Sequence, residues 1–254
     1  MLSMVSGREK ERAREGEKRK REGKMHKKAI CVCSGGLDST VAATIASKSY
    51  EIYIFHASYG QKSEERERAS VEKIAEYLNA SLKIAEIPFL KVLGGSALTS
   101  RQIEIPASIS SISEKETPIT WVPCRNLIIL AHACAYAEVI GADTIFTGFN
   151  AEEALSYPDN TEDFVNRFNF MVEKAVSSRS IPPKVVAPLV KLRKPEIVKI
   201  GFEINAPLHL TYSCYKGGEK HCGVCESCVR RRKAFREAGF EDPAEYADTV
   251  TDER

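Results

Sequence analysis

Short apolar runs alternate with longer amphipathic stretches along most of the chain. The apolar runs predict strands at residues 29–33, 51–56, 82–87, 143–148 and 185–187. The stretches between them predict helices at residues 40–46, 63–78, 126–140 and 162–176, with a further helix beginning at 195–200. Strands that alternate with helices predict an α/β fold, in which helices flank a parallel sheet.

Polar segments follow three of the predicted strands, at residues 34–40, 56–61 and 148–150. Ligands of such folds bind beyond the carboxyl ends of the strands, so we expect the three segments to line one crevice. His56, at the end of its strand, fits a structural role. Residues 94–120 are rich in Ser, Ile and turn residues, and we expect an insertion that covers the crevice.

The segment 34–40, SGGLDST, has the most distinctive chemistry. A glycine turn between a strand and a helix directs backbone N–H groups and the helix N-terminus at one point, which makes an anion site. Gly35 and Gly36 let the backbone approach a phosphate, and Asp38 could cap the helix or orient a metal ion. The segment therefore predicts an ATP-binding loop that consists of Ser34, Gly35, Gly36, Leu37, Asp38, Ser39 and Thr40.

Four of the eight cysteines have the spacing C-x7-C-x2-C-x2-C and are Cys214, Cys222, Cys225 and Cys228. These short spacings, with glycines between the cysteines, let four thiolates surround one tetrahedral ion, which suits zinc or an iron–sulfur cluster. A closed thiolate shell leaves no position for a water molecule. We therefore expect a structural metal, distant from the chemistry. Three other cysteines are expected in the core: Cys31, Cys33 and Cys134.

Length and charge suggest three segments. The chain of 254 residues can bury a full core. Residues 1–28 carry eleven Lys and Arg against five Asp and Glu, which leaves a net charge of −4 for the rest. We expect a basic tail at 1–28, an ATP-binding body at 29–210 and a metal-binding segment at 211–254. The acidic body gives no reason to expect nucleic acid, and no apolar run of about 20 residues predicts a membrane span, so we expect a cytoplasmic protein.

Ten motifs follow one another from residue 34 to residue 228: SGGLDST (34–40), YGQ (59–61), SALT (96–99), VPCRN (122–126), GFNAEE (148–153), SYPD (156–159), APL (187–189), KPEI (194–197), TYSCY (211–215) and CGVCESC (222–228). With these motifs the chain resembles the PP-loop ATP pyrophosphatases and, within them, the family of 7-cyano-7-deazaguanine (preQ0) synthases. The resemblance implies the PP-loop fold, which is like that of the adenine nucleotide α-hydrolases.

The resemblance also implies a reaction. ATP would adenylate the carboxylate of 7-carboxy-7-deazaguanine, ammonia would form an amide, and a second ATP would activate the amide for loss of water. The implied cofactors are a structural Zn²⁺ and a Mg²⁺ that accompanies ATP and is held partly through Asp38 or Asp159. The implied partners are small molecules, and the sequence leaves open whether the protein forms a homodimer. The implied catalytic residues are Asp38 and Arg125, and the implied substrate contacts are Tyr59, Arg125, Asn126, Tyr157, Asp159 and Lys194.

Three other functions fit parts of the sequence. A tRNA-thiolating PP-loop enzyme would need a catalytic cysteine pair, for which Cys124 and Cys134 are candidates. A glutamine-dependent amidotransferase would not need the cysteine cluster. A non-enzymatic zinc module that binds nucleic acid through residues 229–233 and the tail would leave the 34–40 loop unexplained.

Overall fold

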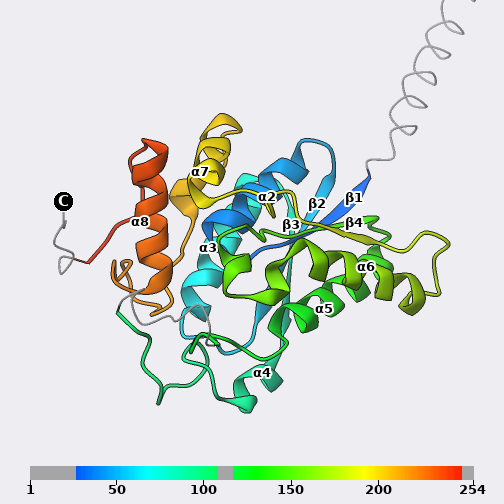
Figure 1. The fold of residues 1–254 in the computed structure, drawn as a ribbon. Coiled ribbons are helices and arrows are strands. Elements are labelled where there is room, and N and C mark those ends of the chain that lie inside the picture. The colour runs from blue at the N-terminus through cyan, green and yellow to red at the C-terminus, as the bar shows by residue number, and fades with distance from the viewer. Residues whose placement is uncertain (1–26, 108–116, 248–254) are drawn as a thin grey trace, which may run out of the picture.

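The computed structural model describes residues 27–107 and 117–247 (Figure 1). Nearly all of the predicted basic tail and part of the 94–120 insertion lie outside these residues. The described chain forms one sheet of five parallel strands in the order β3-β2-β1-β4-β5. The strands are β1 (Lys28–Val32), β2 (Glu51–Ser58), β3 (Ser81–Glu86), β4 (Thr144–Phe146) and β5 (Lys184–Val186). This confirms the predicted α/β architecture.

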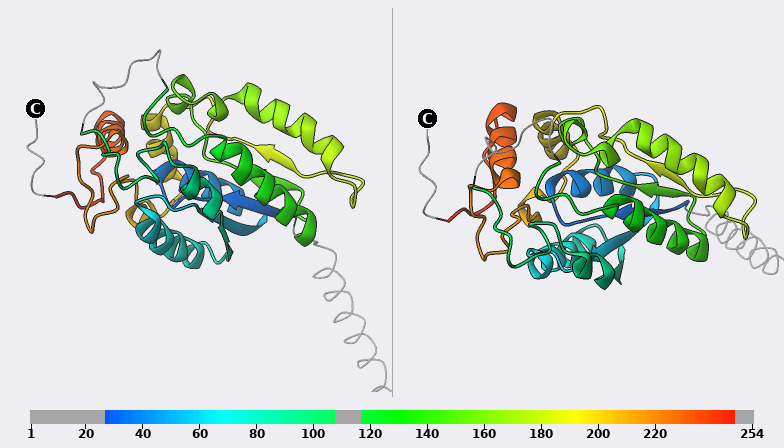
Figure 2. Two further views of the ribbon diagram at one scale, coloured as in Figure 1. Left: turned by 90° about the horizontal axis from the view of Figure 1, so that it is seen from below. Right: turned by 60° about the horizontal axis from the view of Figure 1, so that its bottom comes forward.

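Helices cover both faces of the sheet (Figure 2). They are α2 (Leu37–Ser47), α3 (Glu64–Tyr77), α4 (Pro88–Leu93), α5 (Arg125–Ile140), α6 (Glu162–Ala175), α7 (Lys194–Glu203) and α8 (Glu226–Ala238). Short 3-10 turns lie at Glu153–Leu155, Pro158–Asn160 and Leu208–Leu210. The hydrophobic pattern did not predict α4 or α8.

Alternation along β1 divides the core in two, because successive side chains of a strand point to opposite faces. Ala29 and Cys31 belong to the cluster that joins the sheet to α2 and α3. Ile30 belongs to the cluster that joins it to α5 and α6. Cys33 and Cys134 are also buried, which confirms the expectation that these thiols and that of Cys31 lie in the core.

A third layer covers the outer side of α2. Leu37 and Val41 of α2 pack with Val198 of α7 and Phe235 of α8 in one buried cluster. Full burial of a side chain such as Phe235 stabilises the fold by about 1.5–3 kcal/mol. The C-terminal segment is therefore held beside the start of α2 (Figure 1). In the part of the chain that the structure describes, no helix is long and apolar enough to span a bilayer.

Candidate active site and metal centre

A cavity opens beyond the carboxyl ends of β1, β2 and β4. Its lining includes Ser34 after β1, Tyr59 after β2 and Gly148 after β4, together with Arg125 of α5. The chain changes direction across the sheet between β1 and β4, which is where open α/β folds bind their ligands. This confirms the prediction that the segments after these three strands line one crevice. Leu98 also lines the cavity, so the described part of the 94–120 segment reaches it.

The loop after β1 presents the N-terminus of α2 to the cavity. Gly36 is the N-cap residue, and no side chain caps this helix. The N–H groups of the first turn of a helix have no acceptor within it, so they can bind an anion. Five of the seven predicted ATP-binding residues line the cavity: Ser34, Gly36, Leu37, Asp38 and Ser39.

The other two loop residues, Gly35 and Thr40, support the loop from behind. Thr40 Oγ1 donates a hydrogen bond to the carbonyl oxygen of Gly36 at 2.8 Å. Gly35 has a φ of +82°, and a Cβ there would lie 2.9 Å from the carbonyl oxygen of Glu67. Gly148, in the loop after β4, also has to be glycine, because a Cβ there would lie 2.5 Å from the backbone nitrogen of Ser39. Close packing therefore fixes where the anion site lies.

Three charged side chains from distant parts of the sequence meet beside the anion site. Lys194 Nζ donates to Asp38 Oδ2 at 2.5 Å and to Glu153 Oε1 at 2.9 Å. Burial alone would lower the pKa of Lys194, but the two carboxylates raise it well above its usual value, so the side chain stays charged. Burial would likewise raise the pKa of Glu153, but Lys194 lowers it below its usual value. We call Asp38, Glu153 and Lys194 the charge triad.

Arg125 is a second cation at the cavity. It begins α5 directly after Cys124, whose left-handed backbone (φ 53°) turns the chain into the helix. Its Nη1 donates to the hydroxyl of Tyr59 at 3.5 Å, and its Nε donates to Asn126 Oδ1 at 3.3 Å. Arg125, Tyr59, Asn126 and Lys194, four of the predicted substrate contacts, therefore line the same cavity.

The other two predicted substrate contacts, Tyr157 and Asp159, are not among the residues that line the cavity. The hydroxyl of Tyr157 is hydrogen-bonded to Thr120 Oγ1 at 2.7 Å, and its ring stacks on Trp121. Burial of this hydroxyl raises the pKa of Tyr157 to about 12. Burial also raises the pKa of Asp159, an effect that the charge of Arg125 partly offsets. Asp159 therefore lies near Arg125, and the structure shows no direct ion pair between these two described residues.

Four buried polar atoms of cavity-lining residues have no hydrogen-bond partner among the described residues. They are Asp38 Oδ1, His56 Nε2, Asn126 Nδ2 and Thr147 Oγ1. A buried polar atom without a partner costs free energy, and native structures contain few of them. Their concentration at one cavity indicates a site built for a polar ligand.

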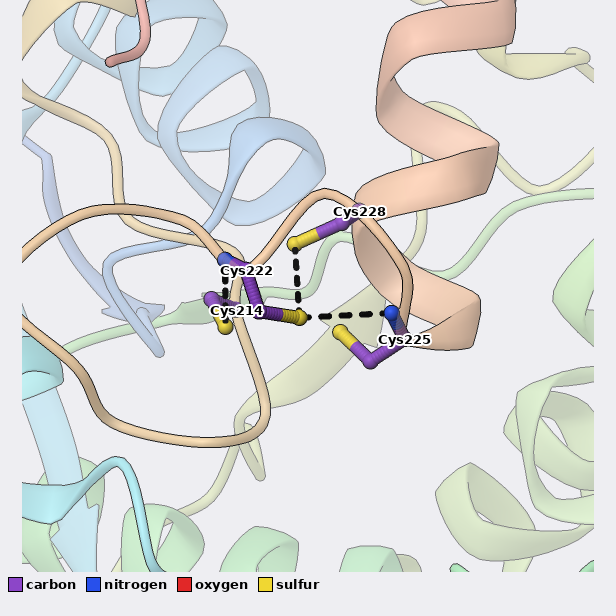
Figure 3. Close-up of side chains that lie close together, drawn as sticks. All are labelled: Cys214, Cys222, Cys225 and Cys228. Atoms are coloured by element: carbon purple, nitrogen blue, oxygen red, sulfur yellow. Dashed lines mark hydrogen bonds between the residues drawn. The ribbon is translucent and has the colours of Figure 1, made fainter. Parts of the chain in front are cut away.

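The four clustered cysteines converge as their spacing predicts. Their Sγ atoms all lie within 4.8 Å of one another, and the four side chains are close together in Figure 3. The Sγ atoms of Cys222 and Cys228 are 3.9 Å apart, close to the sulfur–sulfur distance of about 3.8 Å that tetrahedral Zn–S bonds of about 2.3 Å require. The N–H of Cys225 also donates to Cys222 Sγ. This cluster can therefore hold a tetrahedral metal ion.

The segment that carries the cluster forms part of the cavity wall, and the expectation that the metal lies at a distance from the chemistry stays a prediction. Ser213 and Tyr215 flank Cys214, Ser227 precedes Cys228, and all three neighbours line the cavity. The sequence reasoning missed Tyr215 and Glu153 as cavity residues, although both lie inside recognised motifs, TYSCY and GFNAEE.

Arg231 is a further cavity residue, which the sequence offered only as part of the basic run 229–233. Its side chain is only 2% exposed. Its Nε and Nη2 both donate hydrogen bonds to the carboxylate of Asp242, and its Nη1 donates to Thr211 Oγ1 at 2.7 Å. It also donates to Ser213 Oγ at 3.2 Å. This network fixes the cysteine-bearing segment against the cavity wall.

The cysteine pair that tRNA thiolation would need does not form. Cys124 caps the N-terminus of α5, and Cys134 lies ten residues farther along the chain, inside the same helix. A rise of 1.5 Å per residue separates them by about 15 Å.

The chain is similar to known proteins over most of its length. The family model described as "Queuosine biosynthesis protein QueC" matches residues 28–239. The 7-cyano-7-deazaguanine synthase of Methanothrix thermoacetophila is 54% identical over 222 residues, which cover 86% of this chain and 98% of that protein. The protein of the same name from Methanobrevibacter smithii is 44% identical over 228 residues, 87% of this chain and 99% of the relative. Among solved structures, the U34-tRNA thiolase NcsA of Methanococcus maripaludis is 15% identical, with a TM-score of 0.44 over 89% of this chain and 75% of that one.

Proposed function

The chain belongs to the queuosine biosynthesis protein QueC family, and from this premise we propose that it converts 7-carboxy-7-deazaguanine and ammonia to 7-cyano-7-deazaguanine (preQ0) with ATP. The observation that carries the proposal is the uncapped N-terminus of α2, which opens into a cavity that also holds Lys194 and Arg125. Such a site suits a reaction in which pyrophosphate leaves.

The first step activates the acid. A carboxylate oxygen of 7-carboxy-7-deazaguanine attacks the α-phosphorus of ATP, and pyrophosphate departs. The N–H groups at the start of α2 stabilise the charge on the leaving group, and Lys194 lies beside them through its contact with Asp38. Arg125 holds the carboxylate or the α-phosphate, since its guanidinium can bind either in a bidentate manner.

The second half of the reaction reuses the same groups. Ammonia attacks the acyl carbon and AMP leaves, which gives the amide. The amide oxygen then attacks the α-phosphorus of a second ATP and pyrophosphate departs. Loss of AMP, which takes the amide oxygen, and of the two N–H protons leaves the nitrile. One cavity can carry out both activations, because the carboxylate and the amide place their oxygen at the same position against the loop.

Two metal ions accompany the proposal. Asp38 and Glu153 offer carboxylate oxygens of the kind that Mg²⁺ binds, and Asp38 Oδ1 is without a partner among the described residues. Asp38 fits this role better than Asp159, which does not line the cavity. When bound, the ion supplies charge that neutralises the phosphates. The cysteine cluster would hold Zn²⁺, whose closed thiolate shell stabilises the cavity wall.

We test the proposal by incubating the protein with Mg²⁺, ATP, ammonium and 7-carboxy-7-deazaguanine. We expect AMP and pyrophosphate to be released only when the acid is present, with plain guanine as the matched control that lacks the carboxylate. Release of ADP, or of AMP without the acid, would overturn the proposal. Release of AMP on addition of tRNA alone would favour thiolation instead.

A further inference from the structure

His56 lies near the carboxyl end of β2, is 1% exposed and lines the cavity. Its Nδ1 lies 2.9 Å from the carbonyl oxygen of Cys33. A carbonyl oxygen can only accept, so Nδ1 carries the hydrogen and donates it. In the neutral ring Nε2 is then a hydrogen-bond acceptor. This Nε2 is buried and has no partner among the described residues.

A ligand in the cavity can supply the missing donor. Cys33, to which His56 is tied, directly precedes the 34–40 loop, so His56 lies on the nucleotide side of the site. The charge triad is built from α2, the loop after β4 and α7, whereas His56 is on β2, on the other side of β1 in the sheet. Apolar side chains line the same cavity and suit the faces of a purine ring: Val32, Ala57, Ile129 and Leu130.

We propose that Nε2 of His56 accepts a hydrogen bond from the 6-amino group of adenine and thereby selects ATP among nucleoside triphosphates. The proposal rests on the proposed function, which brings ATP to this cavity. A purine with a 6-oxo group would place an acceptor against the acceptor Nε2, and the site would reject it. A purine with hydrogen at position 6 would leave Nε2 unpaired, as it is without ligand.

Two substitutions separate the ring nitrogens. In His56→Asn the amide nitrogen takes the place of Nδ1 and can still donate to the carbonyl of Cys33, but nothing replaces Nε2. In His56→Gln the side-chain oxygen reaches the position of Nε2. Thr147→Val is the matched control, because it removes another unpartnered cavity atom, Oγ1, on the β4 side.

The measurement is kcat/KM for acid-dependent AMP release with ATP and with purine riboside triphosphate, which lacks the 6-amino group. For the unchanged protein we expect a preference for ATP of about ten-fold, the factor that about 1.4 kcal/mol gives. His56→Asn should reduce this preference to within about two-fold, while His56→Gln keeps part of it and Thr147→Val keeps all of it. The ratio does not depend on the fraction of active protein, so partial misfolding of a variant does not hide the effect.

Several results would overturn the proposal. One is an unchanged protein that uses both nucleotides equally, which needs no variant at all. Another is His56→Asn with the full preference. A third is a preference for ATP over 2′-deoxy-ATP that His56→Asn abolishes, while the preference over purine riboside triphosphate is unchanged. This result would assign His56 to the ribose. A fourth is that His56→Asn no longer discriminates between 7-carboxy-7-deazaguanine and the same acid without its 2-amino group. This result would assign His56 to the acid. In each case AMP release still requires the acid, so the proposed function survives.

Discussion

Replacing Lys194 by methionine tests whether the charge triad is a buried ion network. The substitution keeps an unbranched side chain, one atom shorter, but removes the cation between Asp38 and Glu153. Asp38→Asn is the matched change, because it removes one of the two anions and leaves Lys194 paired with Glu153. The two variants should differ sharply in stability and agree in activity.

The magnitudes follow from burial. Removal of one partner of a buried ion pair costs about 3–5 kcal/mol, and Lys194 is 9% exposed and Asp38 14% exposed in their side chains. Glu153 is 32% exposed, so solvent screens part of its charge and the lower end, about 3 kcal/mol, applies. In a chain of this size that loss lowers Tm by about 6–12 °C. Asp38→Asn should cost about 1 kcal/mol or less, since no charge is left unpaired.

The assay pairs thermal unfolding with acid-dependent AMP release. Both single variants should lose at least about 100-fold in AMP release, because each removes a group beside the leaving phosphates. The double variant Asp38→Asn/Lys194→Met should be more stable than Lys194→Met alone, since one of its two unpaired anions is gone. Zinc content should stay unchanged throughout, because no hydrogen bond or ion pair of the described residues joins the cysteine cluster to the triad.

Two results would refute this reasoning. If Lys194→Met unfolds at the temperature of the unchanged protein, the triad is not a buried network. If Asp38→Asn releases AMP at the parental rate, the 34–40 loop is not the site of ATP activation.

Three further predictions concern other parts of the site. Cys225→Ser should yield less soluble protein with less than one zinc per chain by elemental analysis, and iron with sulfide in the unchanged protein would contradict this. Gly148→Ala should raise KM for ATP and lower Tm, because its Cβ would lie 2.5 Å from the backbone nitrogen of Ser39; an unchanged KM and Tm would count against the packing argument. Burial would raise the pKa of Asp242, but the hydrogen bonds and charge of Arg231 lower it below its usual value. A lowered folded-state pKa adds stability above the unfolded value of about 3.9 and loses it as pH falls through the folded value. Asp242→Asn should therefore have a lower free energy of unfolding in urea than the parent near pH 7. The difference between the two proteins should shrink below about pH 4. A difference that does not change with pH would show that the pKa of Asp242 is not lowered in the folded protein.

The order of strands and helices could be predicted from the sequence because each apolar run is bounded by polar or turn residues. The exceptions are α4, which is only six residues long, and α8. Helix α8 is rich in Arg and Lys, and its buried apolar positions are few: Ala234, Phe235 and Ala238. They pack against α2 and α7 rather than on the sheet, and no local pattern reveals that partner.

The candidate site was predictable where one segment carries it and obscure where distant segments meet. The 34–40 loop and the cysteine spacing each place several groups within a few residues. The contact of Lys194 with Asp38 spans 156 positions of the chain, so only the fold brings the two together. The SYPD motif at 156–159 does not indicate whether its side chains face the cavity. In the structure a 3-10 turn at Pro158–Asn160 holds Asp159, which is not among the residues that line the cavity.

In the proposed reaction one cavity activates first an acid and then an amide with ATP. Supplying the 7-amide in place of the acid, without ammonium, and quantifying nitrile and AMP together tests this sequence of steps. We expect one AMP for each nitrile formed from the amide, and two AMP for each nitrile when the acid and ammonium are the substrates. An inert amide, with the acid still consumed, would contradict this sequence of steps and leave an amide-forming ligase.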